Sequence, residues 1–386
     1  MTAFVQLVVF QAFGNDLEVY QNEVLLPKAM SRLRYKTVAS KILTVNTADE
    51  SKFKGSKIEV PLPVNFDAPQ DFDVVNGTKP TPVIVKSADL VLDKHKFNQV
   101  EFSDMQFTGS SPGAIENSWA GMIDSIATAY DRDAASLGKE IPYFSGDLES
   151  KNRRDATDLI ELQDAIEKMN VYNNRNVLLT GRTNADLLHT YGTHNYREEE
   201  NSGTLSSKFG FNFYTNNSPT VHKAGTATAS AGLKLSAEAL KGSKTLLIDC
   251  AGGETFVYGD LIVIAGTEQS FAVASTVIAA AGVNSVSVTT EIKDNIPGGS
   301  ALRVVGDHRI DLACIPSFAM AASRRLESPV EQPGVISGFI SDPESGLSLM
   351  SMMWYDASRR MHQFRLEILY GMKVFDHSRA MRMGGH

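Results

Sequence analysis

Few residues of this chain combine the type and the spacing that catalysis or ligand binding needs. Residues 242–245, Gly-Ser-Lys-Thr, resemble part of a phosphate-binding loop. In that loop lysine directly follows glycine and a second glycine lies five residues earlier, so this stretch predicts a polar turn before a strand. His189 and His194 are five residues apart, which does not place both on one helix face. We expect them at surface or loop positions and not as metal ligands.

Acidic clusters and tryptophans are the other candidates. Asp131 and Asp133 form an Asp-x-Asp pair, and residues 198–200 are three consecutive glutamates. Both patterns are common on solvated surfaces, so we interpret them as exposed acids. Trp119 and Trp354 are interpreted as core anchors. The motifs of zinc proteases, serine hydrolases and dinucleotide-binding proteins are absent from the sequence, so we predict no enzyme activity, no catalytic residue, no cofactor and no metal site.

Length and composition indicate a folded protein with a sizeable core. The 386 residues are 42% hydrophobic and 21% charged, which suits two domains or one domain with large excursions. No run approaches the roughly 18 apolar residues of a membrane helix. The apolar residues 4–10 follow no basic residue, so no secretory signal is expected. Cys250 and Cys314 lack metal-like spacing and favour a reducing compartment over a disulfide framework.

The net charge of −8 argues against a protein whose main role is binding phosphates. The charge is uneven, however. From residue 357 onward the chain has two acids, Glu367 and Asp376, and these basic residues: Arg359, Arg360, Arg365, Lys373, Arg379 and Arg382. Two interpretations are open: one local surface that faces a polyanion, or solvated charged strand ends. We prefer the second.

A long helix is predicted from Ser111 to Gly138. Apolar residues recur there at steps of three and four, which places them on one stripe of a helix. Ser111 suits the N-cap, Pro112 the first turn and Gly138 the left-handed position beyond the end. Such a helix is about 40 Å long and needs an equally long partner. The stripe consists of Ile115, Trp119, Met122, Ile123, Ile126, Tyr130, Ala134 and Leu137.

The predicted partner is a strand at Phe364–Val374, where apolar and polar residues alternate with period two. The helix and this strand are far apart in sequence. We therefore predict a discontinuous domain, with everything between Lys139 and Arg359 forming a second body.

The N-terminal part reads as an arm followed by a ribbon. Residues 1–50 show an apolar start and a weak helical segment, and we expect them to lie on a neighbouring surface. Pro61 and Pro63 share one face of a strand at 57–66, which confines it to a sheet edge or a projecting hairpin. Strand-like runs follow at 83–92 and 97–107. An isolated hairpin is marginally stable, so we expect contacts from outside its own subunit to hold it.

The second body is predicted to mix helices and strands, with helices at 155–169 and 183–191 and a strand at 176–180. Thr183 or Asn184 would cap the second helix. Residues 224–232, almost entirely Ala, Gly, Thr and Ser, read as a linker. Short strand candidates separated by glycines then indicate an inserted all-β barrel or sandwich. They lie at 245–249, 255–265, 270–273, 284–292 and 301–305.

Three segments carry a resemblance to a known family: HRIDLACIPSFAMA at 308–321, SDPESGLSL at 341–349 and FRLEILYGMKV at 364–374. They resemble the C-terminal half of major capsid (coat) proteins of tailed bacteriophages. The branch with the greatest similarity is typified by a Salmonella podophage coat protein with an inserted β-rich domain. The order of elements extends the resemblance to nearly the whole chain.

The resemblance implies an α+β Hong Kong 97-like capsid fold with an inserted small β-barrel domain. The implied parts are an N-terminal arm (1–50), an extended β-hairpin loop (51–108), a peripheral domain with a spine helix (109–150), an axial domain (151–223 and 307–356), the insert (224–306) and a C-terminal peripheral strand (357–386). The insert is shorter than in the typical member. Lys79 and Asn76, at the expected loop tip, are interpreted as turn residues and not as a covalent cross-link.

The implied function is structural. Copies would form the pentamers and hexamers of an icosahedral virion shell, made in the host bacterial cytoplasm, around double-stranded DNA held by weak, non-specific contacts. A scaffolding protein, a portal and decoration proteins are the implied partners, and no membrane is involved. The alternatives are an encapsulin-like nanocompartment, which shares the fold and encloses enzymes, and an enzyme built on the α/β body.

Overall fold

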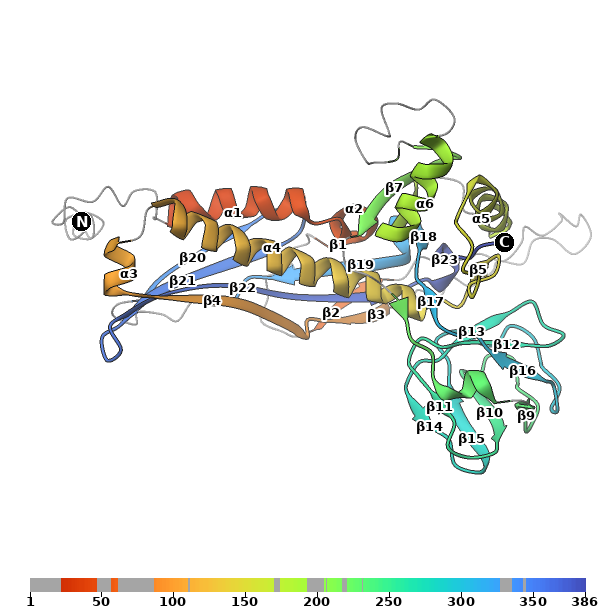
Figure 1. Ribbon diagram of the computed structural model, residues 1–386. Helices are drawn as coiled ribbons and strands as arrows, with labels where there is room; N and C mark the ends of the chain where they lie inside the picture. The colour runs from red at the N-terminus through yellow and green to blue at the C-terminus, as the bar shows by residue number, and fades with distance from the viewer. Residues whose placement is uncertain are drawn as a thin grey trace, which may run out of the picture.

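The computed structural model describes residues 22–46, 57–61, 87–109, 112–169, 174–192, 205, 207–216, 221–230, 232–326, 335–342 and 345–386. In these ranges the chain forms an elongated body, a compact body at one end of it, and a β body beside the compact one (Figure 1). None of the helices within these ranges has the length and apolar character that crossing a membrane requires.

The elongated body is built on a six-stranded sheet with the order β1-β19-β22-β21-β20, and β4 pairs with the other edge of β22. The long strand β22 is shared by its neighbours: residues 361–368 pair with β21 and residues 369–374 with β19. The strands are β1 (Thr44–Asn46), β4 (Lys94–Ser103), β19 (Ala319–Arg324), β20 (Val335–Ser341), β21 (Ser348–Asp356) and β22 (Met361–Val374).

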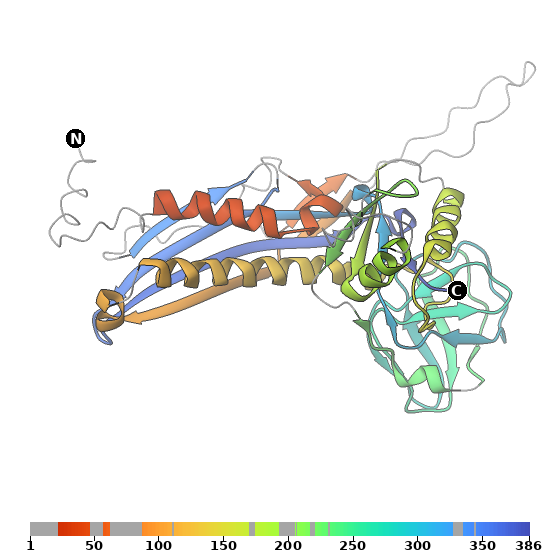
Figure 2. The same cartoon turned by 45° about the horizontal axis from the view of Figure 1, so that its top comes forward.

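Two long helices cover one face of this sheet. Helices α1 (Asn22–Lys36) and α4 (Pro112–Ser136) lie side by side along it (Figures 1 and 2). The short helices α2 (Ala39–Ile42) and α3 (Asp104–Gly109) follow α1 and β4. Helix α4 packs on β22 through ring contacts: Trp119 with Phe364 at 6.3 Å and Tyr130 with Tyr370 at 4.9 Å between centroids. The predicted meeting of the long helix and the C-terminal strand is therefore confirmed.

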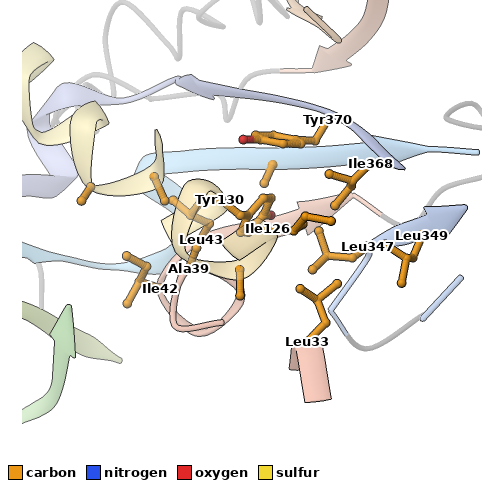
Figure 3. Close-up of a cluster of buried hydrophobic side chains, with 14 of the residues drawn as sticks. Leu33, Ala39, Ile42, Leu43, Ile126, Tyr130, Leu347, Leu349, Ile368 and Tyr370 are labelled. Atoms are coloured by element: carbon orange, nitrogen blue, oxygen red, sulfur yellow. The ribbon is translucent and has the colours of Figure 1, made fainter. Parts of the chain in front are cut away.

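The core between the helices and the sheet explains the apolar stripe of α4. Within the side chains that the structure describes, Trp119, Met122, Ile123, Ile126, Tyr130 and Ala134 are all buried. Leu33 of α1 and Ile368 of β22 lie in the same cluster (Figure 3). The predicted cap Ser111 lies outside the described residues.

The end of the long helix differs from the prediction. Helix α4 ends at Ser136, and Gly138 lies in the 3₁₀ turn η4 (Leu137–Glu140) with an ordinary negative φ. The glycine is needed for close packing, since a Cβ atom there would lie 2.7 Å from Cγ2 of Ile310. The helix ends by tightening from α to 3₁₀ geometry, and no residue in the left-handed conformation directly follows it.

For the part of the N-terminal arm that the structure describes, the surface on which it lies belongs to its own subunit. Residues 26–43 contribute Leu26, Met30, Leu33, Ile42 and Leu43 to the main core, so they pack on their own subunit. Residues 1–21 and 47–50 lie outside the described residues. The weak periodicity of α1 reflects one narrow apolar stripe laid against α4 and β20.

The compact body surrounds a five-stranded sheet with the order β5-β23-β18-β6-β7. Helix α5 (Ala156–Lys168) lies where the helix at 155–169 was predicted, and it begins with a capping box formed by Asp155 and Asp158. Helix α6 (Gly181–Gly192) starts directly after β6, so Thr183 and Asn184 lie inside it and neither is its cap. The strands are β5 (Phe144–Ser145), β6 (Arg175–Thr180), β7 (Phe211–Asn216), β18 (Leu312–Cys314) and β23 (Ala380–Met383).

The β body, residues 224–230 and 232–305, has a hydrophobic core of its own. The predicted linker was wrong: residues 226–229 form the 3₁₀ turn η5 (Thr226–Ala229), and Ala227 is buried in that core. The predicted strand 255–265 is two strands separated by a turn at Gly259, whose φ is +92°. The strands are β9 (Lys234–Leu235), β10 (Thr245–Cys250), β11 (Thr255–Phe256), β12 (Leu261–Ile264), β13 (Ser270–Ala272), β14 (Val277–Ile278), β15 (Gly282–Ser287) and β16 (Leu302–Val304).

The boundaries predicted for residues 307–386 do not match the strand pairing. Residues 319–324, 335–341 and 348–356 form β19, β20 and β21 of the elongated body, although we assigned them to the axial domain. Residues 380–383, which we placed in the peripheral domain, form β23 of the compact sheet. Short 3₁₀ turns, η6 (Pro316–Phe318) and η7 (His377–Arg379), connect the two bodies. Period-two patterns identify strands but do not say which sheet each strand joins.

Candidate assembly surface

A two-stranded ribbon leaves the elongated body. Strands β2 (Lys57–Pro61) and β3 (Ser87–Val91) are antiparallel, with Lys57 opposite Val91 and Pro61 opposite Ser87. In the described part of the chain these two strands form a sheet of their own. Each therefore has one edge of N–H and C=O groups without a strand partner, the arrangement that pairs most readily with another chain.

The base of this ribbon is fixed on its own subunit. Ile58, Val60, Leu90 and Leu92 are buried with Ala322 of β19 in a small separate core. The ammonium group of Lys373 donates a hydrogen bond of 2.9 Å to the carbonyl oxygen of Asp89. We expected contacts from outside the subunit to hold the hairpin, and the structure shows that its own subunit holds the base. The segment 62–86, with Lys79 and Asn76, lies outside the described residues.

Gly371 of β22 allows the ribbon to sit this close to the sheet. A Cβ atom at this position would lie 2.0 Å from the carbonyl oxygen of Val91 and 3.1 Å from Cα of Leu92. A glycine inside a strand is a known sign of close backbone approach. The glycine inside the Phe364–Val374 pattern therefore indicates from sequence that another backbone segment lies close. It does not indicate which segment that is.

The run 97–107, predicted as the next strand, does not extend the hairpin. Its first part belongs to β4, which pairs with β22 from Ser103 opposite Met361 to Lys94 opposite Tyr370. Its last part is helix α3, beginning at Asp104. Strand β4 therefore widens the sheet of the elongated body and leaves the ribbon two strands wide.

The sheet face opposite the helices presents aromatic rings and arginines. Phe97 and Phe339 are 57% and 48% exposed. Each ring carries a guanidinium group: Arg365 lies 4.3 Å from the Phe97 centroid and Arg325 lies 3.3 Å from that of Phe339. Such cation–π pairs stabilise rings at exposed positions by about 0.5–1 kcal/mol. Adjacent strand residues point to opposite faces, and Met353 belongs to the helix-side core, so Trp354 points to this face. Trp354 is half-buried and is not the core anchor that we predicted.

Both acids of the long helix have structural partners, although we predicted exposed acids, and the Asp133 side chain is still 22% exposed. Asp131 is buried and accepts N–H bonds from Val38 at 3.0 Å and Ala39 at 2.9 Å, so it fixes the start of α2. Its burial raises the pKa of this carboxyl group to about 6. Asp133 accepts a hydrogen bond of 2.8 Å from the Tyr370 hydroxyl group. Sequence alone could not distinguish these acids from surface ones, because their partners lie far away along the chain.

The basic residues after position 357 do not form one surface. Arg359 and Arg360 lie at the β21–β22 turn, while Arg379 and Arg382 lie beyond the opposite end of β22, about 45 Å away for a strand of this length. Arg379 pairs with Asp376 at 2.9 Å, and the Arg382 side chain is completely buried. Arg382 therefore cannot contact DNA from this position, and the polyanion-facing interpretation loses one of its residues.

The remaining candidate ligands are scattered. His189 is exposed on α6 with Arg153 at 3.3 Å, and His194 and residues 198–200 lie outside the described residues. Among the described residues, Asp155, Asp158 and His386 bring ligand atoms within 4.8 Å of one another. Asp155 and Asp158 already cap α5, and His386 bonds Asp158 at 3.0 Å, so the group is accounted for as a capped helix start. Residues 242–245 form the predicted polar turn before β10, with Gly242 at a φ of +83°.

Comparisons with known proteins give similarities in structure but not in sequence. No family model matches the chain, and no curated protein is similar to it. The capsid of the cyanophage P-SCSP1u is 11% identical with a TM-score of 0.47, over 91% of this chain and 88% of that one. The capsid of Ralstonia phage GP4 is 8% identical with a TM-score of 0.46, over 90% of both chains. The mature capsid of bacteriophage PhiM1 is 8% identical with a TM-score of 0.44, over 90% and 86%.

Proposed function

We propose that this chain is the major capsid subunit of a tailed phage, whose copies assemble into the icosahedral shell around double-stranded DNA. The observation that carries the proposal is the ribbon β2–β3. Its base is anchored by a core of its own, and within the described residues neither strand pairs with a third strand. A ribbon built in this way can add strands to a neighbouring chain without unfolding its own subunit.

The rest of the architecture supports the same proposal. The elongated body, with α4 along β22, would be the peripheral domain and its spine. The compact body would be the axial domain at the centre of pentamers and hexamers, the ribbon the extended loop, and the β body the inserted barrel-like domain. Each contact can be modest, because a closed shell engages every subunit through several interfaces at once.

The partners are part of the proposal. A scaffolding protein, a portal and decoration proteins would complete assembly in the host bacterial cytoplasm, and the packaged DNA would meet the shell through weak, non-specific contacts. No catalytic step enters this function. The helix-free sheet face, with exposed Phe97 and Phe339, is a further surface that an assembly can cover.

The test is negative-stain electron microscopy of the purified full chain, combined with mass photometry of the same sample. Closed shells or five- and six-membered rings are expected, alone or on addition of a candidate scaffolding protein from the same genome. Monomers under both conditions would contradict the proposal. The content of the shells separates the alternatives: DNA-filled heads identify a coat protein, while an enclosed enzyme identifies a nanocompartment.

A further inference from the structure

Two paired strands connect the β body covalently to the rest of the chain, and the β body also packs on Leu148 through Leu261, Ala272 and Val305. Strand β8 (Val221–His222) enters it, and strand β17 (His308–Arg309) leaves it. The two strands pair antiparallel with His222 opposite His308, and the two imidazole rings lie 5.2 Å apart. Both histidines are almost completely buried, with 1% and 4% of their surface exposed. Two titratable rings therefore face each other where the chain enters and leaves the β body.

Arg382 of β23 locks this connection from the side of the compact body. Its Nη1 atom lies 2.9 Å from Nε2 of His308. Its Nη2 atom donates to the carbonyl oxygens of Lys139 at 2.6 Å and Gly259 at 3.2 Å. One buried guanidinium group thus holds the compact body, the turn after α4 and the β body together.

Asp260 supplies the matching negative charge from the β body. It is fully buried, and its carboxylate lies 2.7 Å from Nε2 of His222. It also accepts N–H bonds from Val257 at 2.7 Å and Gly225 at 3.2 Å. Arg382 contacts His308 and Asp260 contacts His222, so the joint holds one buried guanidinium group and one buried carboxylate group beside the paired rings.

The hydrogen bonds of His308 define its protonation state. Its Nδ1 atom lies 2.8 Å from the carbonyl oxygen of Gly306, which can only accept, so Nδ1 carries a hydrogen. Its Nε2 atom faces Arg382, which can only donate, so Nε2 must be bare. A second proton on His308 would set two N–H groups against each other and place two cations side by side in a buried site.

We propose that this joint is an acid-sensitive connection, which holds the β body in one orientation at neutral pH and releases it as a unit when His308 takes up a proton. Arg382 and His222 oppose that proton, and Asp260 favours it. Farther out, Glu149 accepts the Gly306 N–H, Asp307 accepts the Ala224 N–H, and Glu140 accepts from the Tyr258 hydroxyl group at 2.7 Å. These three acids are already bonded to neutral donors, and Glu149 also pairs with Arg303 at 3.2 Å.

The electrostatics agree with the geometry. Burial, with Arg382 and His222 nearby, lowers the pKa of His308 to about 4, from an ordinary 6.5. Burial likewise lowers the pKa of Arg382 to about 9. Because opening would restore the ordinary histidine pKa, acid favours the open form. Linkage between these two values predicts that opening increases roughly 20-fold between pH 7 and pH 5.

The test is hydrogen exchange of the full chain between pH 7 and pH 5, corrected for the intrinsic pH dependence of exchange. Residues 221–226 and 305–309 should gain roughly 20-fold in exchange, while β10 in the β-body core keeps its protection. His308→Gln keeps an acceptor for Arg382 and a donor for Gly306 but cannot titrate, so its gain should fall below about threefold. His189→Gln, on exposed α6, should behave like the wild type.

Two results would overturn the proposal. One is a wild-type joint whose exchange does not change between pH 7 and pH 5, a measurement that needs no variant to fold. The other is a His308→Gln protein that opens in acid as the wild type does. Loss of protection in β10 together with the joint would also contradict it, because the β body would then unfold and not be released intact.

Discussion

Replacing Gly371 with alanine should displace the ribbon from the elongated body. The new Cβ atom would lie 2.0 Å from the Val91 carbonyl oxygen, where an ordinary contact needs more than 3 Å. The obstacle is backbone on both sides, so a side-chain rotation cannot relieve it. Strand β3 or β22 must retreat by more than 1 Å, and overpacking of this kind costs about 1–3 kcal/mol.

The retreat would also weaken what lies under the ribbon. Leu90 is fully buried and Ile58 and Leu92 nearly so, all in the small core beside Gly371. The bond from Lys373 to the Asp89 carbonyl oxygen would be stretched, a loss of about 1 kcal/mol. We therefore expect the ribbon base to become less stable by about 3 kcal/mol, which corresponds to roughly 100-fold faster amide exchange in β2 and β3.

Gly121 provides the matched control. It lies on the exposed side of α4, and a Cβ atom there would meet nothing within 4 Å. Gly121→Ala should stabilise the chain by about 0.5–1 kcal/mol through helix propensity alone. Hydrogen exchange resolves the two strands, and urea unfolding gives the free energies. If β2 and β3 exchange at the wild-type rate in Gly371→Ala, the reasoning about the ribbon base is refuted.

The proposed function adds a second measurement on the same pair of variants. Gly371→Ala should give fewer closed shells than the wild type at equal protein concentration, while Gly121→Ala should give as many. Equal yields for all three proteins would show that the position of the ribbon base does not control assembly.

Three further predictions concern the separate bodies. Leu366→Ala empties a fully buried position under α4 and should lower the free energy of unfolding in urea by about 2–5 kcal/mol. Leu240 is 58% exposed, so Leu240→Ala should change that free energy by less than about 0.5 kcal/mol. Equal effects of the two variants would contradict the core assignment. Folding raises the pKa of Asp131 from 3.8 to about 6, so its contribution to stability is complete below pH 3.8 and is lost as pH rises through 6, by about 3 kcal/mol. Asp131→Asn should remove this decline in urea unfolding measured from pH 4 to 7. An unchanged decline in the variant would show that another group causes it. Gly225→Ala would place a Cβ atom 1.9 Å from the Thr255 carbonyl oxygen and should expose the β-body core to hydrogen exchange while α5 stays protected. Gly181→Ala has open space around its Cβ position and should leave both regions protected. A β-body core that stays protected in Gly225→Ala would contradict the packing of η5.

The sequence by itself determined the elements that depend on local pattern. The stripe from Trp119 to Ala134 defined the long helix, and alternation defined the strand from Phe364 to Val374, because each pattern matches the period of the backbone that carries it. The mixed α+β class and the all-β character of residues 245–305 followed from the same local signals.

The tertiary structure alone decided which strands share a sheet. Strands β19 to β21 joined β22 and not the compact body, and β23 crossed to the compact sheet, because hydrogen-bonded registers between distant segments leave no trace in either segment alone. Asp131, Arg382 and Gly371 show the same limit for single residues. In sequence they resemble an ordinary surface acid, a surface base and a strand glycine. Their roles come from contacts with residues far away in the chain: Asp131 with Ala39 (92 residues apart), Arg382 with His308 (74) and Gly371 with Val91 (280).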